Sequence, residues 1–173
     1  MADNPPKSRA ELLARLDELG IAHKTLDHPA VFTVAESDQL HRDLPGGHTK
    51  NLFLKDAKEK LWLIIAEAHT LVDLKSLPKT IGSARLSFGK PDLLMQVLGV
   101  TPGSVTALSL INDGAHRVSV VVDERLMGYE QINCHPLENT ATTTISREDL
   151  MRFIRACGHQ PKVLPLTGPA TQG

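Results

Sequence analysis

Aromatic residues make up only 3% of this 173-residue sequence, which contains one tryptophan and one tyrosine. The chain therefore cannot offer a platform of stacked aromatic rings to single-stranded nucleic acid, and its core must be mostly aliphatic. A basic excess is also missing, since 19 lysines and arginines face 20 aspartates and glutamates, for a formal net charge of -1. Proteins that wrap long nucleic acids usually carry a basic excess, so any contact with nucleic acid should be small and local.

Cysteines and long apolar runs are scarce as well. The two cysteines, Cys134 and Cys157, form no motif, which argues against a disulfide scaffold and favours a reduced cytosol. The longest apolar run, 61–66, is far too short to span a membrane. The N-terminus lacks the basic-then-apolar pattern of a signal peptide. We therefore expect a cytoplasmic protein without membrane contact.

Several catalytic motifs are absent from the sequence. There is no phosphate-binding G-x-x-x-x-G-K-[ST] loop, dinucleotide-binding G-x-G-x-x-G, H-E-x-x-H or C-x-x-C motif. Gly103-Ser104 does not form a G-x-S-x-G nucleophile elbow, because the last glycine is missing. The eight histidines are scattered, and only Cys134-His135 places two metal-ligand types together. Adjacent residues rarely ligate one ion, so we expect neither a metal nor a cofactor.

The patterns that are present predict one α/β domain of mixed α+β type. Two capping boxes, at 8–11 and 33–36, mark helix starts, and Gly20 and Gly99 mark helix ends. Helices are expected at 8–19, 34–41, 90–99 and 147–157, with a short one within 72–82. Strands are expected at 21–28, 51–55, 60–66, 117–124 and within 138–146, with an edge strand at 162–166, while 42–49 is expected as a loop. Without a regular βαβ repeat, these elements should form a mixed sheet with packed helices. Residues 1–7 should be disordered, 8–165 should form the domain, and 166–173 should be a flexible tail.

Four polar or rigid turns stand beside the apolar strands: "DHPAVFTVAE" (27–36), Lys50-Asn51, "GVTPGS" (99–104) and "HPLENTAT" (135–142). The glycine–proline loop can present backbone N–H groups to an oxyanion or a phosphate. Taken singly, each turn also has a structural explanation. A strand-end lysine is usually solvated, His-Pro turns are mostly structural, and an asparagine can simply bond its own turn.

Together, "HPAVFTVAE", "KNLFLKD", "LGVTPGSVTAL" and "HPLENTATT", in this order and spacing, resemble the YbaK / prolyl-tRNA synthetase-associated editing superfamily. The resemblance covers about residues 8–165 and is greatest to the free-standing branch that deacylates mischarged alanyl-tRNA(Pro). It implies a mixed, barrel-like β-sheet surrounded by helices. It also implies a hydrolase that acts in trans on the ester between a wrong amino acid and the terminal adenosine of tRNA. The implied partners are the acceptor end of mischarged tRNA and prolyl-tRNA synthetase.

The same resemblance assigns roles to residues. Those implied in catalysis are Lys50, Gly103, Ser104 and His135. Those implied in substrate binding are His28, Val31, Phe32, Thr33, Asn51, Gly99, Pro102, Asn139 and Thr140. Val31, Phe32, Leu52 and Val105 are expected to supply aliphatic pocket walls.

The residues favour ester hydrolysis by direct attack of water, because Ser104 has no base beside it in the sequence. The resemblance implies help from a ribose hydroxyl. Lys50 is expected to act through its charge and not as a base. His135 is open to a catalytic or a structural role. Three alternatives remain at this stage. The first is a deacylase for cysteinyl-tRNA(Pro) or another small residue. The second is a non-catalytic nucleic-acid-binding or regulatory module, and the third is a small-molecule sensor that uses the same pocket.

Overall fold

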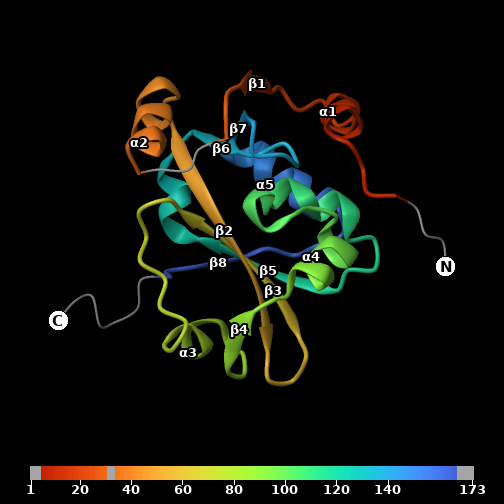
Figure 1. Cartoon of the computed structure of the whole chain (residues 1–173), viewed down its shortest axis with the longest axis vertical. Helices are drawn as coiled ribbons and strands as arrows, with labels where there is room; N and C mark the ends of the chain where they lie inside the picture. The colour runs from red at the N-terminus through yellow and green to blue at the C-terminus, as the bar shows by residue number, and fades with distance from the viewer. Residues whose placement is uncertain (1–4, 31–33, 167–173) are drawn as a thin grey trace.

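The long strand β2 (Gly47–Asp56) lies at the centre of the fold. The structure is a computed structural model, and it describes residues 5–30 and 34–166. The described strands form one mixed sheet in the order β1-β7-β6-β2-β3-β5-β8, and β4 also pairs with β2 (Figure 1). The other strands are β1 (Lys24–Asp27), β3 (Leu61–Glu67), β4 (Leu86–Phe88), β5 (Val118–Asp123), β6 (Gln131–Cys134), β7 (Ala141–Ser146) and β8 (Lys162–Leu164). β2 begins parallel to β6 and continues antiparallel to β3, so it links the two halves of the sheet.

Helices cover this sheet, and local sequence signals set their ends. The helices are α1 (Arg9–Glu18), α2 (Val34–Asp43), α3 (Leu77–Ile81), α4 (Pro91–Leu98) and α5 (Arg147–Ala156), with 3-10 turns η1 (Pro102–Ser104), η2 (Ala107–Asn112) and η3 (Glu124–Gly128). The predicted capping box of α1 is confirmed, because the Ser8 hydroxyl accepts from Glu11 N and the Glu11 side chain accepts from Ser8 N. Ser146 caps α5 through a single bond, in which its hydroxyl accepts from Asp149 N.

The central strands β2, β3 and β5 separate two apolar clusters. Side chains alternate between the faces of a strand, and the register pairs Asn51 with Ile65 and Lys50 with Ala66. Ile65 belongs to a large cluster that also takes in the apolar faces of α1, α4 and α5. Ala66 belongs to a smaller cluster completed by α3. The two neighbours in the Lys50-Asn51 motif therefore point to opposite sides of the sheet.

Most of the expected elements are confirmed, and the differences have local causes. The prediction of a loop over 42–49 is wrong at both ends, because α2 continues to Asp43 and β2 already begins at Gly47. Residues 47–48 are held in the strand by their pairing with β6. The short strands β4 and β6 escape the sequence patterns, since each pairs with only a few residues of a neighbour. The glycine–proline loop and the apolar stretch after it fold as η1 and η2.

The structure describes neither the first nor the last few residues of the chain. Residues 1–4 and 167–173 lie outside the described residues, so the predicted tail boundaries stay predictions. Lys7, within the segment expected to be disordered, donates its backbone N–H to Asn112 Oδ1 at 2.8 Å. Within the described residues, no helix is both long and apolar enough to cross a bilayer.

Asp56 is a buried carboxylate that holds the β2–β3 hairpin. Its oxygens accept from the backbone N–H of Lys58 and Lys60 at 2.9 and 3.0 Å, and from the Trp62 indole at 3.2 Å. Burial alone would raise the pKa of Asp56, but these donors outweigh it and leave the pKa below its ordinary value. Asp56→Ala should therefore lower the free energy of unfolding at pH 7 by about 2 kcal/mol, measured by urea denaturation.

The sign of the pH effect follows from the lowered pKa. The charged form favours the folded state above the unfolded pKa of about 4, and this contribution is lost as pH falls through the folded pKa. The gap between wild type and Asp56→Ala should thus shrink between pH 5 and pH 2. Asp73→Ala is the control, because Asp73 accepts one backbone bond at the surface. A gap that stays constant with pH would assign the stability loss to packing alone.

Candidate active site

Lys50 lies near the start of β2, half-buried on the face of the smaller cluster. Among the described residues, no carboxylate forms an ion pair with its ammonium group. Lys55, further along β2, contrasts with it because its ammonium lies 3.3 Å from Glu59 Oε2. Lys50 therefore keeps its charge available for an anionic or carbonyl group that approaches this end of the strand.

Asn51, on the opposite face, carries an unsatisfied acceptor. Its Oδ1 is buried and has no hydrogen-bond partner among the described residues. A buried polar atom without a partner costs folding free energy, about 1–3 kcal/mol, and such atoms are uncommon in folded proteins. Because this atom is enclosed, a bound molecule can reach it only if neighbouring side chains move, so the substrate-binding role of Asn51 stays a prediction.

The structure brings the two His-Pro turns together. His28 N donates to Thr140 O at 2.9 Å, and its Nε2 lies 2.8 Å from the Thr142 hydroxyl. His135 Nδ1 lies 3.1 Å from Ala141 O, so this nitrogen donates and Nε2 keeps its lone pair. Burial lowers the pKa of His135, and the nearby His28 lowers it further, so the imidazole is neutral at pH 7.

The glycine–proline loop packs against the second of these turns. A Cβ atom built on Gly103 would lie 3.1 Å from Asn139 Nδ2, so a larger residue would press on the turn. Gly103 N has no hydrogen-bond partner among the described residues, whereas Ser104 N donates to Thr101 O at 2.9 Å. Gly103 N–H is therefore one available amide donor of this loop. Among the described residues no base bonds the Ser104 hydroxyl, which agrees with a contact role over a nucleophilic one.

Two cavities adjoin these turns and share Leu40. The first, of about 210 Å³, reaches from α2 to the strands β2, β6 and β7 and is lined by Leu40, His41, His48, Thr49, Asn133, Cys134, His135 and Thr142. The second, of about 240 Å³, lies between the 28–30 segment and α2. Val31, Phe32 and Thr33, predicted to line the amino-acid pocket, lie outside the described residues.

Gly99 is not brought into this group. It caps the C-terminus of α4 at φ +68, and its surroundings are Pro6 and Asn112. Its positive φ alone requires glycine, so the structure supplies a local reason for it. Leu52 and Val105, expected as walls of one pocket, pack against different clusters, because Leu52 shares the face of Lys50 and Val105 does not. Pro102 precedes Gly103 in η1, and Thr140 contacts His28.

Sequence reasoning missed most of the cavity lining, including His41, His48 and Thr49. Strand periodicity was the available signal, because it would have continued β2 backward from Lys50 and placed His48 on its face. Cys134 lines the cavity, but burial raises its pKa to about 12, so the thiol is not a nucleophile at neutral pH. Within residues 5–30 and 34–166, no three His, Cys, Asp or Glu side chains are arranged to hold a metal ion.

The fold and the site define a class: a small mixed α/β domain in which a glycine–proline loop packs against two joined His-Pro turns beside polar cavities, with a strand-end lysine on the central strand. The chain belongs to the aminoacyl-tRNA editing domain family, whose model matches residues 28–153. It is 36% identical over 160 residues to the prolyl-tRNA editing protein ProX of Acetoanaerobium sticklandii, covering 92% of this chain and 98% of that protein. It is 38% identical over 161 residues to the prolyl-tRNA synthetase associated domain-containing protein 1 of Mus musculus, covering 90% and 95%.

A solved structure supports the fold independently. The crystal structure of a candidate trans-editing enzyme for prolyl tRNA synthetase superposes with a TM-score of 0.69 at 20% identity, over 92% of this chain and 98% of that one. At this identity the likeness establishes the fold alone. It confirms the predicted mixed sheet with surrounding helices, although the described strands form an open path whose ends are β1 and β8.

Proposed function

We propose that this protein is a trans-acting aminoacyl-tRNA deacylase that hydrolyses the ester of mischarged tRNA(Pro), with alanyl-tRNA(Pro) as its substrate. The observation that carries the proposal is Lys50, a half-buried cation without an ion-pair partner among the described residues. The relative in Acetoanaerobium sticklandii is named a prolyl-tRNA editing protein, which supports tRNA(Pro) as the carrier.

The chemistry has a physical reason. A pocket built for proline rejects a smaller amino acid poorly, because lost methylenes are worth only about 1–3 kcal/mol of discrimination. A second site that admits alanine and excludes proline can remove the error after charging. Lys50 would hold the terminal phosphate or the ester carbonyl by charge, and Gly103 N–H would donate to the developing oxyanion. His28 and His135, with Asn139 and Thr140, would orient the terminal ribose.

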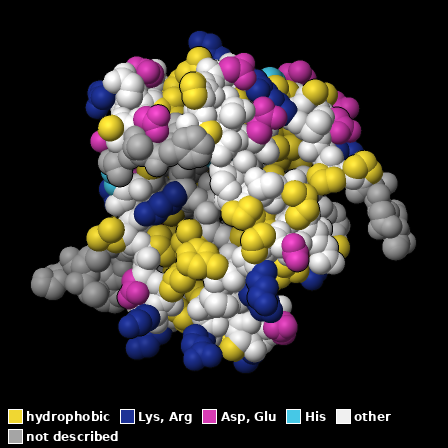
Figure 2. All heavy atoms as spheres, viewed as in Figure 1, with side chains coloured by type: hydrophobic (Ala, Val, Ile, Leu, Met, Phe, Trp, Pro, Cys, Tyr) yellow, Lys and Arg dark blue, Asp and Glu magenta, His cyan; other side chains and the backbone are white. Residues whose placement is uncertain are grey.

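The surface agrees with a short nucleic-acid contact. Lysine and arginine side chains on the face in Figure 2 form separate groups and no continuous basic stripe. Only the single-stranded acceptor end needs to enter, so few phosphate contacts are required. Contact with prolyl-tRNA synthetase and a cytoplasmic location are part of the same proposal.

A panel of mischarged tRNAs tests the function. Purified protein should release alanine from alanyl-tRNA(Pro) under single-turnover conditions, followed by loss of radiolabel from acid-precipitated tRNA. Prolyl-tRNA(Pro) should remain charged, because the rate constants of a useful editing enzyme must differ by at least about 10²-fold.

The other members of the panel distinguish the alternatives. Faster release of cysteine from cysteinyl-tRNA(Pro) would reassign the substrate but keep the deacylase. Tight tRNA binding without any ester loss would contradict the enzyme and leave a binding module.

A further inference from the structure

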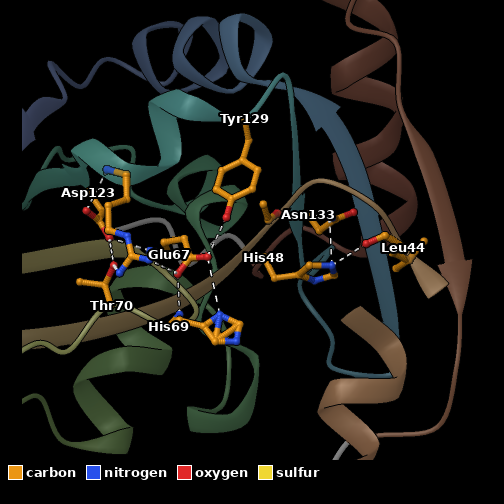
Figure 3. Close-up of polar contacts among 10 residues, drawn as sticks. Leu44, His48, Glu67, His69, Thr70, Asp123, Tyr129 and Asn133 are labelled. Carbon is orange, nitrogen blue, oxygen red and sulfur yellow. Dashed lines mark hydrogen bonds and ion pairs between the residues drawn. The ribbon is translucent and has the colours of Figure 1, made fainter. Parts of the chain in front are cut away.

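His48, two residues before Lys50, is a nearly buried histidine with a fixed tautomer. Its Nε2 lies 2.7 Å from the carbonyl oxygen of Leu44 (Figure 3). A carbonyl oxygen can only accept, so Nε2 carries the hydrogen and Nδ1 keeps a lone pair. The geometry thus leaves one basic nitrogen on this ring.

Asn133 holds the turn that carries His48. Its Nδ2 lies 3.2 Å from both Pro45 O and Gly47 O, and its Oδ1 accepts from the Thr144 hydroxyl. Since both Nδ2 hydrogens have carbonyl acceptors, the 3.4 Å approach of Nδ2 to His48 Nε2 is a packing contact. The His48 ring is therefore held from β6 as well as from its own turn.

The surroundings of His48 favour its neutral form. Burial lowers its pKa, and the neighbouring His41 and His69 lower it further, while the bond to Leu44 O and the charge of Glu67 act in the opposite direction. The His41 ring, from α2, stacks on His48 with centroids 4.0 Å apart. At neutral pH the ring is therefore an uncharged base.

The free nitrogen of His48 has access to the cavity. Nδ1 has no hydrogen-bond partner among the described residues, and it is not among their fully enclosed polar atoms. His48 lines the cavity of about 210 Å³ together with Thr49 and His135. A water molecule occupies about 30 Å³ of liquid, so this cavity has room for an attacking water and a small ester group.

We propose that His48 Nδ1 is the general base of the deacylation, a role that rests on the proposed function. His48 takes one proton from a water in the cavity, and the water oxygen forms a bond to the ester carbonyl carbon. The tetrahedral intermediate then collapses, the bond from carbon to the ribose oxygen breaks, and His48 returns the proton to that oxygen. The products are a free amino acid and a tRNA with a free terminal hydroxyl.

Glu67 supports the charged form of His48 that this step creates. The Glu67 carboxylate is 6% exposed, accepts from the Tyr129 hydroxyl at 3.0 Å and lies 3.7 Å from His69 Nδ1 (Figure 3). The other titratable groups facing His48 are His41 and His69, with the neutral thiol of Cys134 and the neutral His135 across the cavity. The negative charge of Glu67 therefore offsets the transient imidazolium.

His48→Gln is the decisive variant, because the glutamine amide can still donate to Leu44 O but has no basic nitrogen. Its single-turnover rate constant for alanyl-tRNA(Pro) at pH 7 should fall by about 10²-fold or more, with the Kd for tRNA unchanged. Without a general base, hydroxide must attack, so the logarithm of the rate constant should rise with pH at a slope near one between pH 6 and 9. The wild type should instead reach a plateau. His48→Asn, which loses the bond to Leu44 O as well, should show the same slope.

His23→Gln is the matched control, since His23 pairs with Asp17 beside α1 and lies outside the cavity lining. Wild-type rates with a wild-type plateau in His48→Gln would overturn the role of His48 and leave the deacylase intact. A uniform loss that keeps the plateau would also overturn it and make His48 structural. An inactive wild type would overturn the proposed function together with this role.

Discussion

Lys50→Ala should reduce the single-turnover rate constant for alanyl-tRNA(Pro) deacylation by about 10²–10³-fold, the loss seen when one preorganised donor to a developing charge is removed. Lys50 is half-buried, and its ammonium group has no ion-pair partner within the described residues, so its removal should cost the unliganded protein little folding free energy. The midpoint of thermal unfolding should therefore stay within a few degrees of the wild type. Filter-based deacylation and circular dichroism measure the two quantities on the same preparations.

Lys55→Ala provides the comparison on the same strand. Lys55 is paired with Glu59 in an exposed ion pair, which is worth at most about 1 kcal/mol, so its loss should alter neither activity nor fold. Full activity of Lys50→Ala would remove Lys50 from the site. Equal loss in both lysine variants would point to general attraction of tRNA instead of a specific clamp.

Asn51→Leu should raise stability while lowering activity. The substitution removes the buried Oδ1 that has no partner in the described part of the chain, and so relieves a desolvation cost of about 1 kcal/mol. If the same oxygen accepts from the substrate, the rate constant should fall by about 10²-fold, as for a hydrogen bond to a charged or catalytic donor. Urea denaturation measures the expected gain in stability, and single-turnover deacylation measures the expected loss of activity.

Asn112→Leu is the control, because it replaces an asparagine whose side-chain amide has hydrogen-bond partners. Asn112 Nδ2 donates to Leu98 O at 3.0 Å, and its Oδ1 accepts from Lys7 N at 2.8 Å. This variant should lose stability and keep its activity. A destabilised Asn51→Leu with wild-type rates would mean that Asn51 serves the fold.

Local signals in the sequence account for most of the secondary structure. The Ser8 capping box, the apolar run of β3 and the Pro91–Gly99 frame of α4 are each complete within a short window, and each is confirmed. The sequence signal for β6 is not contained in such a short window. This strand pairs with four residues of nearby β7, and its two partners in β2 are distant in the chain, so a window along the sequence could not reveal its place beside β2.

The same distinction explains the site. The four motifs could be selected from their order, and the structure places three of them in contact, through His28 with Thr142 and Gly103 with Asn139. The opposite orientation of Lys50 and Asn51 follows from strand alternation, but the buried Oδ1 does not, since it depends on what packs above β2. His48 lies just before the apolar stretch that marks β2 in the sequence, so only an extension of the strand backward from Lys50 would have placed it on β2.

The pairing of β1 with β7 has a consequence for the order in which the protein is made and folded. His28 and Thr142, which meet at 2.8 Å beside the cavity, are 114 residues apart in the chain. Closing so large a loop is entropically costly until both ends can rest on formed structure, so such contacts form late in folding. During synthesis, a nascent chain without β7 cannot join the two His-Pro turns. Deacylase activity should therefore first appear only when nearly the whole domain has left the ribosome.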